Sequence, residues 1–328
     1  MPTKRHHYLP QCYLEHFLPT DEAKTFWVYD KAGGAPRPQT PINTGVEGHL
    51  YTVIGPEGDP DDFVEVGILA PADGGVAPIL RRWAEPGAQP TKDELPVMGE
   101  FLAYMHSRVP RRIDHVREFA KLYAVRRSQE LACRSDLLNE YLKCYEREHP
   151  DSPASSFEDL QTSFTNIEER FELSINRQAA MLISLVCSRS IAEELATMHW
   201  ELIHLPTDNQ FVTCDAPLVS FASDDSGHAV FGAGYGLSQA EVSFPVSPSS
   251  CLFLNRWAPG NSVIPNKAFV REMNKRTARM AERFVISQKP SSEAEELTKR
   301  FAYTTNLPKL DREQLFRMID KFMDSLDD

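Results

Sequence analysis

Residues 25–29 read Thr-Phe-Trp-Val-Tyr, a short apolar run that lies between turn-forming residues and decides the fold class. Short runs rich in aromatic and β-branched side chains and bounded by such residues predict strands. A similar run, Val285-Ile-Ser287, lies near the other end of the chain. Because helical patterns fill the middle, we expect an α+β fold in which the N- and C-terminal zones share a sheet.

Working outward from this run, we divide the chain into three zones and interpret residues 1–328 as a single domain. The first zone, 1–90, is β-rich and interrupted by breakers such as Pro71-Ala-Asp-Gly-Gly75. The second, 91–204, is largely helical. The third, 205–328, combines further β-rich runs with two helices.

Helix starts and stops are visible in the middle zone. Thr91 with Glu94, and Ser155 with Glu158, fit capping boxes, in which each side chain satisfies a backbone amide at the helix start. Pro110 predicts the end of a helix or a kink. The apolar stretch around Leu182 predicts a helix buried on most sides.

Charge and composition exclude some classes of protein. The chain has 35 Lys and Arg against 47 Asp and Glu, a net charge of −12, and 41% of its residues are hydrophobic. This apolar content is ample for a folded core. The acidic balance argues against a protein that coats nucleic acid non-specifically, although it permits a local basic patch.

The sequence also bears on compartment and cofactors. The N-terminal residues show no secretory pattern, and no apolar run approaches the length of a membrane span. The six cysteines are scattered without a CxxC pair, which is typical of reduced thiols and argues against a structural zinc site. We therefore expect a cytoplasmic protein that does not engage membranes. Phosphate-binding glycine motifs are missing, so no nucleotide or flavin cofactor is implied.

The segment His6–Phe17, HHYLPQCYLEHF, resembles the opening HHYxPQxYLxxF signature of an uncharacterised, mainly bacterial family known as domain of unknown function 4238. Cys12 and Ala216 depart from the family pattern. Further stretches match in the family's order: Phe26–Lys31, Glu47–Tyr51, Arg108–Pro110, Phe211–Pro217, Phe244–Pro248 and Asn274. The resemblance implies one shared domain over nearly the whole chain. Members are associated with bacterial defence or toxin-like genes.

Two adjacent histidines are the first candidate catalytic groups. His6 and His7 precede a short helix whose free amides, with Gln11, would seat a phosphate or another anion. Neighbouring residues of an extended chain point to opposite faces, so we expect one histidine to face a site. Alternatively, one imidazole binds a core carbonyl and the other is solvated.

Asp215 follows a β-like run and precedes Pro217, a usual way to present a metal ligand or a general base. With Glu47 and His7, it would form a hard-cation site that suits Mg²⁺ or Mn²⁺ better than Zn²⁺. Alternatively, Asp215 caps a turn. Arg108, at a helix end, either binds substrate phosphate or pairs with a buried carboxylate such as Asp215.

A helix expected from residue 266 to 284 carries cations at four-residue spacing: Lys267, Arg271, Lys275, Arg279 and Arg283. This stripe would suit a nucleic-acid backbone. A solvated face, or pairing with an acidic final helix expected over 311–326, is the alternative.

We therefore expect a metal-assisted phosphodiester hydrolase, in one form a nuclease with a toxin or phage-defence role. His6, His7 and Asp215 would be catalytic in this hypothesis, and Gln11 and Arg108 would bind substrate. The alternative is a non-catalytic sensor or adaptor in which the same side chains form a buried network. A protein partner or a second copy of the chain is compatible with either function.

Overall fold

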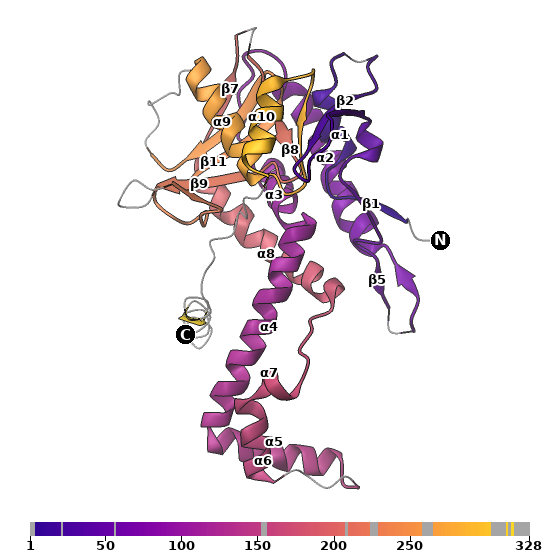
Figure 1. Cartoon of the computed structure of the whole chain (residues 1–328), viewed down its shortest axis with the longest axis vertical. Helices are drawn as coiled ribbons and strands as arrows, with labels where there is room; N and C mark the ends of the chain where they lie inside the picture. Colours follow the sequence, from indigo (N-terminus) through magenta and orange to yellow (C-terminus); the bar gives the residue numbers. More distant parts are fainter. Residues whose placement is uncertain are drawn as a thin grey trace. The chain divides into compact units, whose positions relative to one another are not determined.

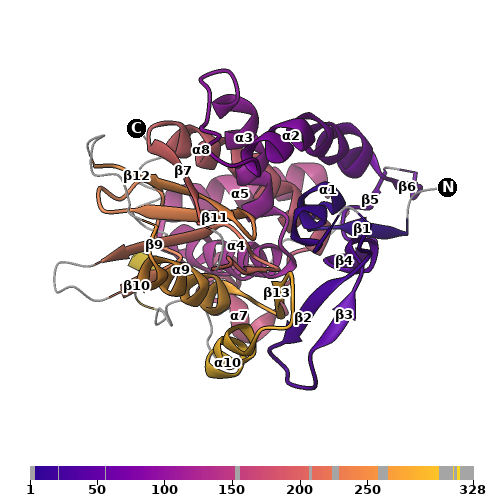
Figure 2. The same ribbon diagram turned by 90° about the horizontal axis from the view of Figure 1, so that it is seen from above.

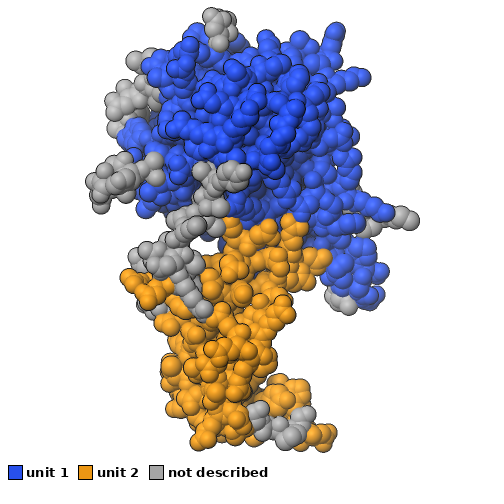
Figure 3. Space-filling view, viewed as in Figure 1, with its two compact units in different colours: residues 1–113, 181–308 blue, residues 114–180, 309–328 orange. Residues whose placement is uncertain are grey.

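The computed structural model describes residues 4–20, 22–55, 57–151, 156–206, 209–223, 229–257, 265–302, 313 and 316–317. Contacts divide the chain into two compact units (Figure 3). Unit 1 comprises residues 1–113 and 181–308, and unit 2 comprises 114–180 and 309–328. That residues 1–328 form a single domain stays a prediction.

The two ends of the chain share a sheet, as predicted for an α+β fold. In unit 1, a four-stranded sheet has the order β3 (Arg37–Gln39), β2 (Phe26–Asp30), β13 (Phe284–Ser287), β8 (Thr213–Cys214). All its neighbours are antiparallel, and Val285 lies opposite both Tyr29 and Cys214. The side chains of these three residues are buried together beneath two helices, α9 (Lys267–Met280) and α10 (Ser292–Arg300). Figure 1 shows these helices side by side.

A second, five-stranded antiparallel sheet forms the centre of unit 1. Its order is β10 (Ala229–Phe231), β9 (Val219–Ser223), β11 (Glu241–Ser247), β12 (Ser250–Asn255), β7 (His199–His204). Because side chains alternate along a strand, Cys251 and Phe253 pack toward α9. Phe244 lies opposite Leu252 and contacts Tyr13 and Phe101 instead. Helices thus cover both faces of the central strands (Figure 2).

The N-terminal zone contains a long helix that the sequence patterns did not predict. Before this helix, the N-terminal zone contains two short pairs of strands and several short turns. The first pair is β1 (Arg5–His7) with β4 (Val46–Gly48), and the second is β5 (Val53–Ile54) with β6 (Pro60–Asp61). Between the strands lie α1 (Gln11–Leu14) and two 3₁₀ turns, Glu15–Phe17 and Pro41–Asn43. A π-helical turn (Val64–Leu69) then leads into α2 (Ala70–Trp83).

The interpretation of Pro71–Gly75 as a chain breaker was therefore wrong. Proline is tolerated in the first turn of a helix, where its missing N–H has no partner to lose. The glycines are accommodated because α2 buries Val76, Leu80 and Trp83, and tertiary packing outweighs weak helix propensity.

The middle zone is largely helical, as predicted, but only as far as Ala196: its last residues, His199–His204, form strand β7 of the central sheet, so the boundary at 204 was wrong. In unit 1, α3 (Leu95–Ser107) ends just before Pro110, where α4 (Pro110–Cys133) begins. Unit 2 contains most of α4, then α5 (Ser135–Glu148), α6 (Phe157–Thr165) and α7 (Ile167–Arg170). The cap of α6 is Ser156, whose hydroxyl accepts the amide of Asp159 at 3.1 Å. Ser155 lies outside the described residues.

Helix α8 (Arg177–Ala196) is less buried than expected. Met181 and Leu185 are buried, four residues apart on one stripe, but Leu182, Ile183 and Val186 are 38%, 44% and 76% exposed. A helix hides only the stripe that faces its neighbours, so a continuous apolar run does not ensure burial all round. Among the described residues, no helix is long and apolar enough to cross a membrane. The helix expected over 311–326 lies almost entirely outside the described residues.

Candidate functional site

The two N-terminal histidines lie on β1 and point to opposite sides, as strand geometry predicts. His6 has no exposed surface: its Nδ1 accepts the backbone amide of Tyr51 at 2.8 Å, and its ring stacks on that of Tyr51 with centroids 5.4 Å apart. His7 is half-buried, with Nε2 3.2 Å from the carbonyl oxygen of Ile42. Burial lowers the pKa of His7, so the ring is neutral near pH 7. Of the two, only His7 keeps exposed surface.

Arg108 caps the end of α3 and has no exposed surface. Its Nη1 donates to both carboxylate oxygens of Asp73, in the first turn of α2, at 3.0 and 3.1 Å. Its Nη2 lies 2.7 Å from the sulfur of Met105, and the guanidinium carbon lies 5.6 Å from the ring centre of Phe101. The carboxylate that pairs with Arg108 is therefore Asp73 rather than Asp215.

Glu65 and Cys12 also lie near Arg108 and Asp73, and we call these four residues the Arg108 cluster. Burial raises the pKa of Glu65 to about 7, against the opposing effect of the Arg108 charge, and Glu65 lies on the π-helical turn. Such turns recur at functional sites. Within the described part of the chain, neither Glu65 Oε2 nor Arg108 Nε has a hydrogen-bond partner, although both atoms are buried. Burial raises the pKa of the Cys12 thiol to about 11, so this cysteine is not a reactive thiolate.

Asp215 belongs to a second cluster and is 1% exposed. Its Oδ1 accepts the amide of Glu282 at 2.8 Å, and its Oδ2 accepts the amide of Arg283 at 2.7 Å. Burial raises the pKa of Asp215 to about 6, with these amide bonds acting in the opposite direction. Asp215 therefore caps a turn, but that turn lies between α9 and β13 rather than in its own segment.

The neighbours of Asp215 are also joined to one another. The buried Lys31 donates from Nζ to the carbonyl oxygen of Ala281 at 2.6 Å, at the end of α9. Glu47 lies 3.2 Å from the guanidinium of Arg283, and Glu282 pairs with Arg111. A cation near the last carbonyls of a helix is favourable, so Lys31 stabilises this end of α9.

The expected Mg²⁺ or Mn²⁺ site would need His7, Glu47 and Asp215 to converge. Within the described ranges, no group of three or more His, Cys, Asp or Glu side chains is arranged to hold a metal ion. The oxygens of Asp215 accept two amides, Glu47 pairs with Arg283, and His7 faces Ile42. These donors do not fit one cation in this conformation, and the metal site stays a prediction.

The remaining residues expected to bind substrate are Gln11 and the cations of α9, and they lie on different elements. Gln11, half-buried, is the first residue of α1. On α9, Lys275 pairs with Glu272, and Arg276 pairs with both Glu272 and Glu241. Arg279 lies 4.1 Å from the ring centre of Phe231. Internal pairing therefore accounts for the second half of the basic stripe.

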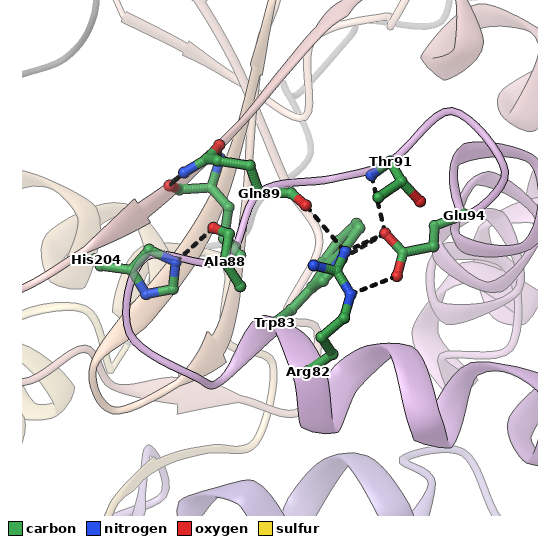
Figure 4. Close-up of polar contacts among 8 residues, drawn as sticks. Arg82, Trp83, Ala88, Gln89, Thr91, Glu94 and His204 are labelled. Atoms are coloured by element: carbon green, nitrogen blue, oxygen red, sulfur yellow. Dashed lines mark hydrogen bonds and ion pairs between the residues drawn. The ribbon is translucent and has the colours of Figure 1, made fainter.

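A third polar network joins α2, α3 and β7 (Figure 4). The carboxylate of Glu94 accepts Arg82 Nε at 2.7 Å, Trp83 Nε1 at 3.1 Å and the Thr91 amide at 2.9 Å. The last contact is the one a capping box at Thr91 would make, but α3 begins only at Leu95, so this contact closes the turn before the helix and the predicted helix start at Thr91 was wrong. Burial by itself would raise the pKa of Glu94, but these hydrogen bonds lower it to about 2.

Sequence reasoning missed Asp73, Glu65 and Lys31. Asp73 lies in the segment Pro71–Gly75, which we interpreted as a chain breaker. An acid two residues after a proline is, however, itself a signal of a helix start. The burial of Lys31 has no local signal in Tyr29-Asp-Lys-Ala-Gly33.

The chain has an α+β fold, and the polar side chains of its signature segments form hydrogen bonds and ion pairs within unit 1. Residues 5–291 match the family described as "Protein of unknown function (DUF4238)", and the chain belongs to that family. No curated protein and no solved structure matches the chain.

Proposed function

We propose that the protein is a non-catalytic sensor or adaptor, in which the polar side chains of the family signature hold the fold together. One observation carries this proposal: Arg108 has no exposed surface and places Nη1 between the two oxygens of Asp73. A guanidinium so engaged fixes the end of α3 to the start of α2. Because the side chain has no exposed surface, an incoming phosphate cannot reach its donors in this conformation.

The other signature residues support the same role. A general acid, base or nucleophile must come within hydrogen-bond reach of its substrate. His6 is buried and accepts a hydrogen bond from the backbone amide of Tyr51, and the buried Asp215 accepts hydrogen bonds from two backbone amides. Each therefore satisfies a buried polar group of the chain itself, which is how polar networks give a fold its unique arrangement.

The rival proposal is the phosphodiester hydrolase, and one observation favours it. His7 is half-buried, and Glu65, whose pKa is raised to about 7, has a carboxylate oxygen without a hydrogen-bond partner among the described residues. A carboxyl group that titrates near neutral pH, as Glu65 does, suits general acid–base chemistry. The hydrolase would then use His7 and Glu65 rather than Asp215.

A cleavage assay separates the two functions. The full chain is incubated with labelled DNA or RNA and Mg²⁺ or Mn²⁺, beside the variants His7→Ala, Glu65→Gln and Asp215→Asn, and the thermal unfolding midpoint of each is measured. We expect no cleavage that depends on these residues, together with a lower midpoint for Asp215→Asn. Cleavage by the parent chain that His7→Ala abolishes at an unchanged midpoint would establish the hydrolase instead.

A further inference from the structure

A hollow of about 300 Å³ lies where the first turns of α9 and α10 approach the segment that leads into β8. Three cations line it: Lys267 and Arg271 on successive turns of α9, and Lys289 just before α10. One acid, Glu293 in the first turn of α10, also lines it. The residues that line the hollow belong to unit 1, and they include none of the residues of the Arg108 and Asp215 clusters.

The cations of the hollow differ from those further along the same helix. Lys275 and Arg276 have carboxylate partners, as described above. Lys267, Arg271 and Lys289 are exposed, and within the described part of the chain none of them forms an ion pair or a side-chain hydrogen bond. In a chain with 47 acids against 35 bases, three cations without partners around one hollow leave a local excess of positive charge.

The backbone adds to this charge. The start of a helix carries a partial positive charge from its free amides, and a first-turn acid usually offsets it. The first turn of α9 contains no acid and instead carries Lys267, whereas the first turn of α10 carries Glu293 and Glu295, so the partial charge without an offsetting acid is that of α9. The caps Asn266 and Ser291 accept one amide in each helix, from Phe269 and Ala294, and they also fix where the two helix starts lie.

We propose that this hollow binds a small phosphate-bearing anion, a phosphomonoester or a pyrophosphate. Its volume lies at the lower end of the range for ligand sites, about 300–1,000 Å³. The described residues that line it include no aromatic ring on which a base could stack, which favours a small anion over a single strand of nucleic acid. This proposal rests on the proposed sensor function, and it names the class of ligand that the sensor would bind.

Calorimetric titration of the full chain with inorganic pyrophosphate tests the proposal. We expect one site, with a dissociation constant that rises with salt concentration because the contacts are between charges. Arg271→Ala and Lys289→Ala should each weaken binding by at least about tenfold, the loss that corresponds to one charge-assisted hydrogen bond. Glu293→Gln should strengthen it, because the one acid at the hollow repels an anion.

Lys275→Ala is the matched control, because it removes one positive charge from the same helix outside the hollow. It should change the dissociation constant less than twofold. Three outcomes overturn the proposal: no binding of pyrophosphate; equal losses in Lys275→Ala and Arg271→Ala; or tighter binding of an oligonucleotide that the hollow variants abolish, which would assign the surface to nucleic acid. A failure of the sensor role appears elsewhere, as residue-dependent cleavage of DNA or RNA, and leaves pyrophosphate binding unchanged.

Discussion

Nη1 of Arg108 lies 3.0 and 3.1 Å from the two carboxylate oxygens of Asp73, so one nitrogen joins the end of α3 to the first turn of α2. The two residues are 35 positions apart, and the intervening chain contains the turn that reverses its direction between the helices. Burial of the guanidinium is costly unless its charge is compensated. The pair therefore fixes how α2 and α3 pack, and through them how Phe101 meets Phe244 of the central sheet.

Asp215→Asn should destabilise unit 1. An asparagine oxygen replaces only one of the two acceptors, so one of the amides of Glu282 and Arg283 loses its partner. A buried unsatisfied amide costs about 1–3 kcal/mol, and the loss should appear as a lower midpoint of urea unfolding. The exposed Asp59 supplies the control Asp59→Asn. Equal midpoints for both variants and the parent would show that Asp215 does not hold this turn.

Glu65 should make stability fall as pH rises. Its pKa is about 7 in the folded chain against an ordinary value of 4.5, so the folded state holds the proton more tightly. The resulting stabilisation is fully present below pH 4.5 and is lost as pH rises through 7. Glu65→Gln should therefore match the parent near pH 4 and exceed it in thermal stability at pH 8. Glu57→Gln, at an exposed position, should show no such divergence.

Glu94 should make the stability of the protein fall as pH decreases in the acid range. Hydrogen bonds from Arg82, Thr91 and Trp83 lower its pKa to about 2 from 4.5, although burial acts against them. Its contribution to stability is present above pH 4.5 and is lost as pH falls toward 2. Acid unfolding followed by circular dichroism should shift to higher pH in Glu94→Gln, because the amide cannot form the same ion pair. An unchanged acid midpoint, equal to that of Asp93→Asn, would contradict this account of the network.

The single-domain prediction can be tested with the tryptophans of the chain. All four lie in unit 1: Trp27, Trp83, Trp200 and Trp257. Tryptophan fluorescence therefore reports unit 1 alone, whereas far-ultraviolet circular dichroism also reports the helices of unit 2. Coincident urea transitions by the two probes are expected if residues 1–328 unfold as one domain. Two separated transitions would show that the units are independent.

The sheet shared by the chain ends was predictable because its strands have strong local signatures. Phe26–Asp30 and Phe284–Ser287 are short apolar runs between turn residues, and a helical middle leaves them free to pair. Helix α2 was not predictable in this way. Its prolines and glycines suggest a loop, and only the burial of Val76, Leu80 and Trp83 against the rest of unit 1 makes it a helix.

The sequence singled out candidate site residues but not the partners that the structure gives them, and the role of these residues in a site stays a prediction. The family resemblance singled out Arg108 and Asp215, and both are buried. Their partners are Asp73 and the amides at 282 and 283, which lie 35 and about 67 positions away. Contacts over such separations depend on how whole elements pack, which local patterns of residue types do not record.

The measurement that most directly tests the structural role of the signature is a double-mutant cycle on Arg108 and Asp73, read as the urea unfolding midpoint by tryptophan fluorescence. Asp73→Ala leaves the fully buried charge of Arg108 without its partner, and an uncompensated buried charge typically costs about 3–5 kcal/mol. Arg108→Met should cost less, because the side chain of Asp73 is 23% exposed and water can solvate its charge. The double variant removes both charges, so we expect it to recover much of that loss. Single variants as stable as the parent, or a double variant whose loss equals the sum of the two single losses, would contradict the account.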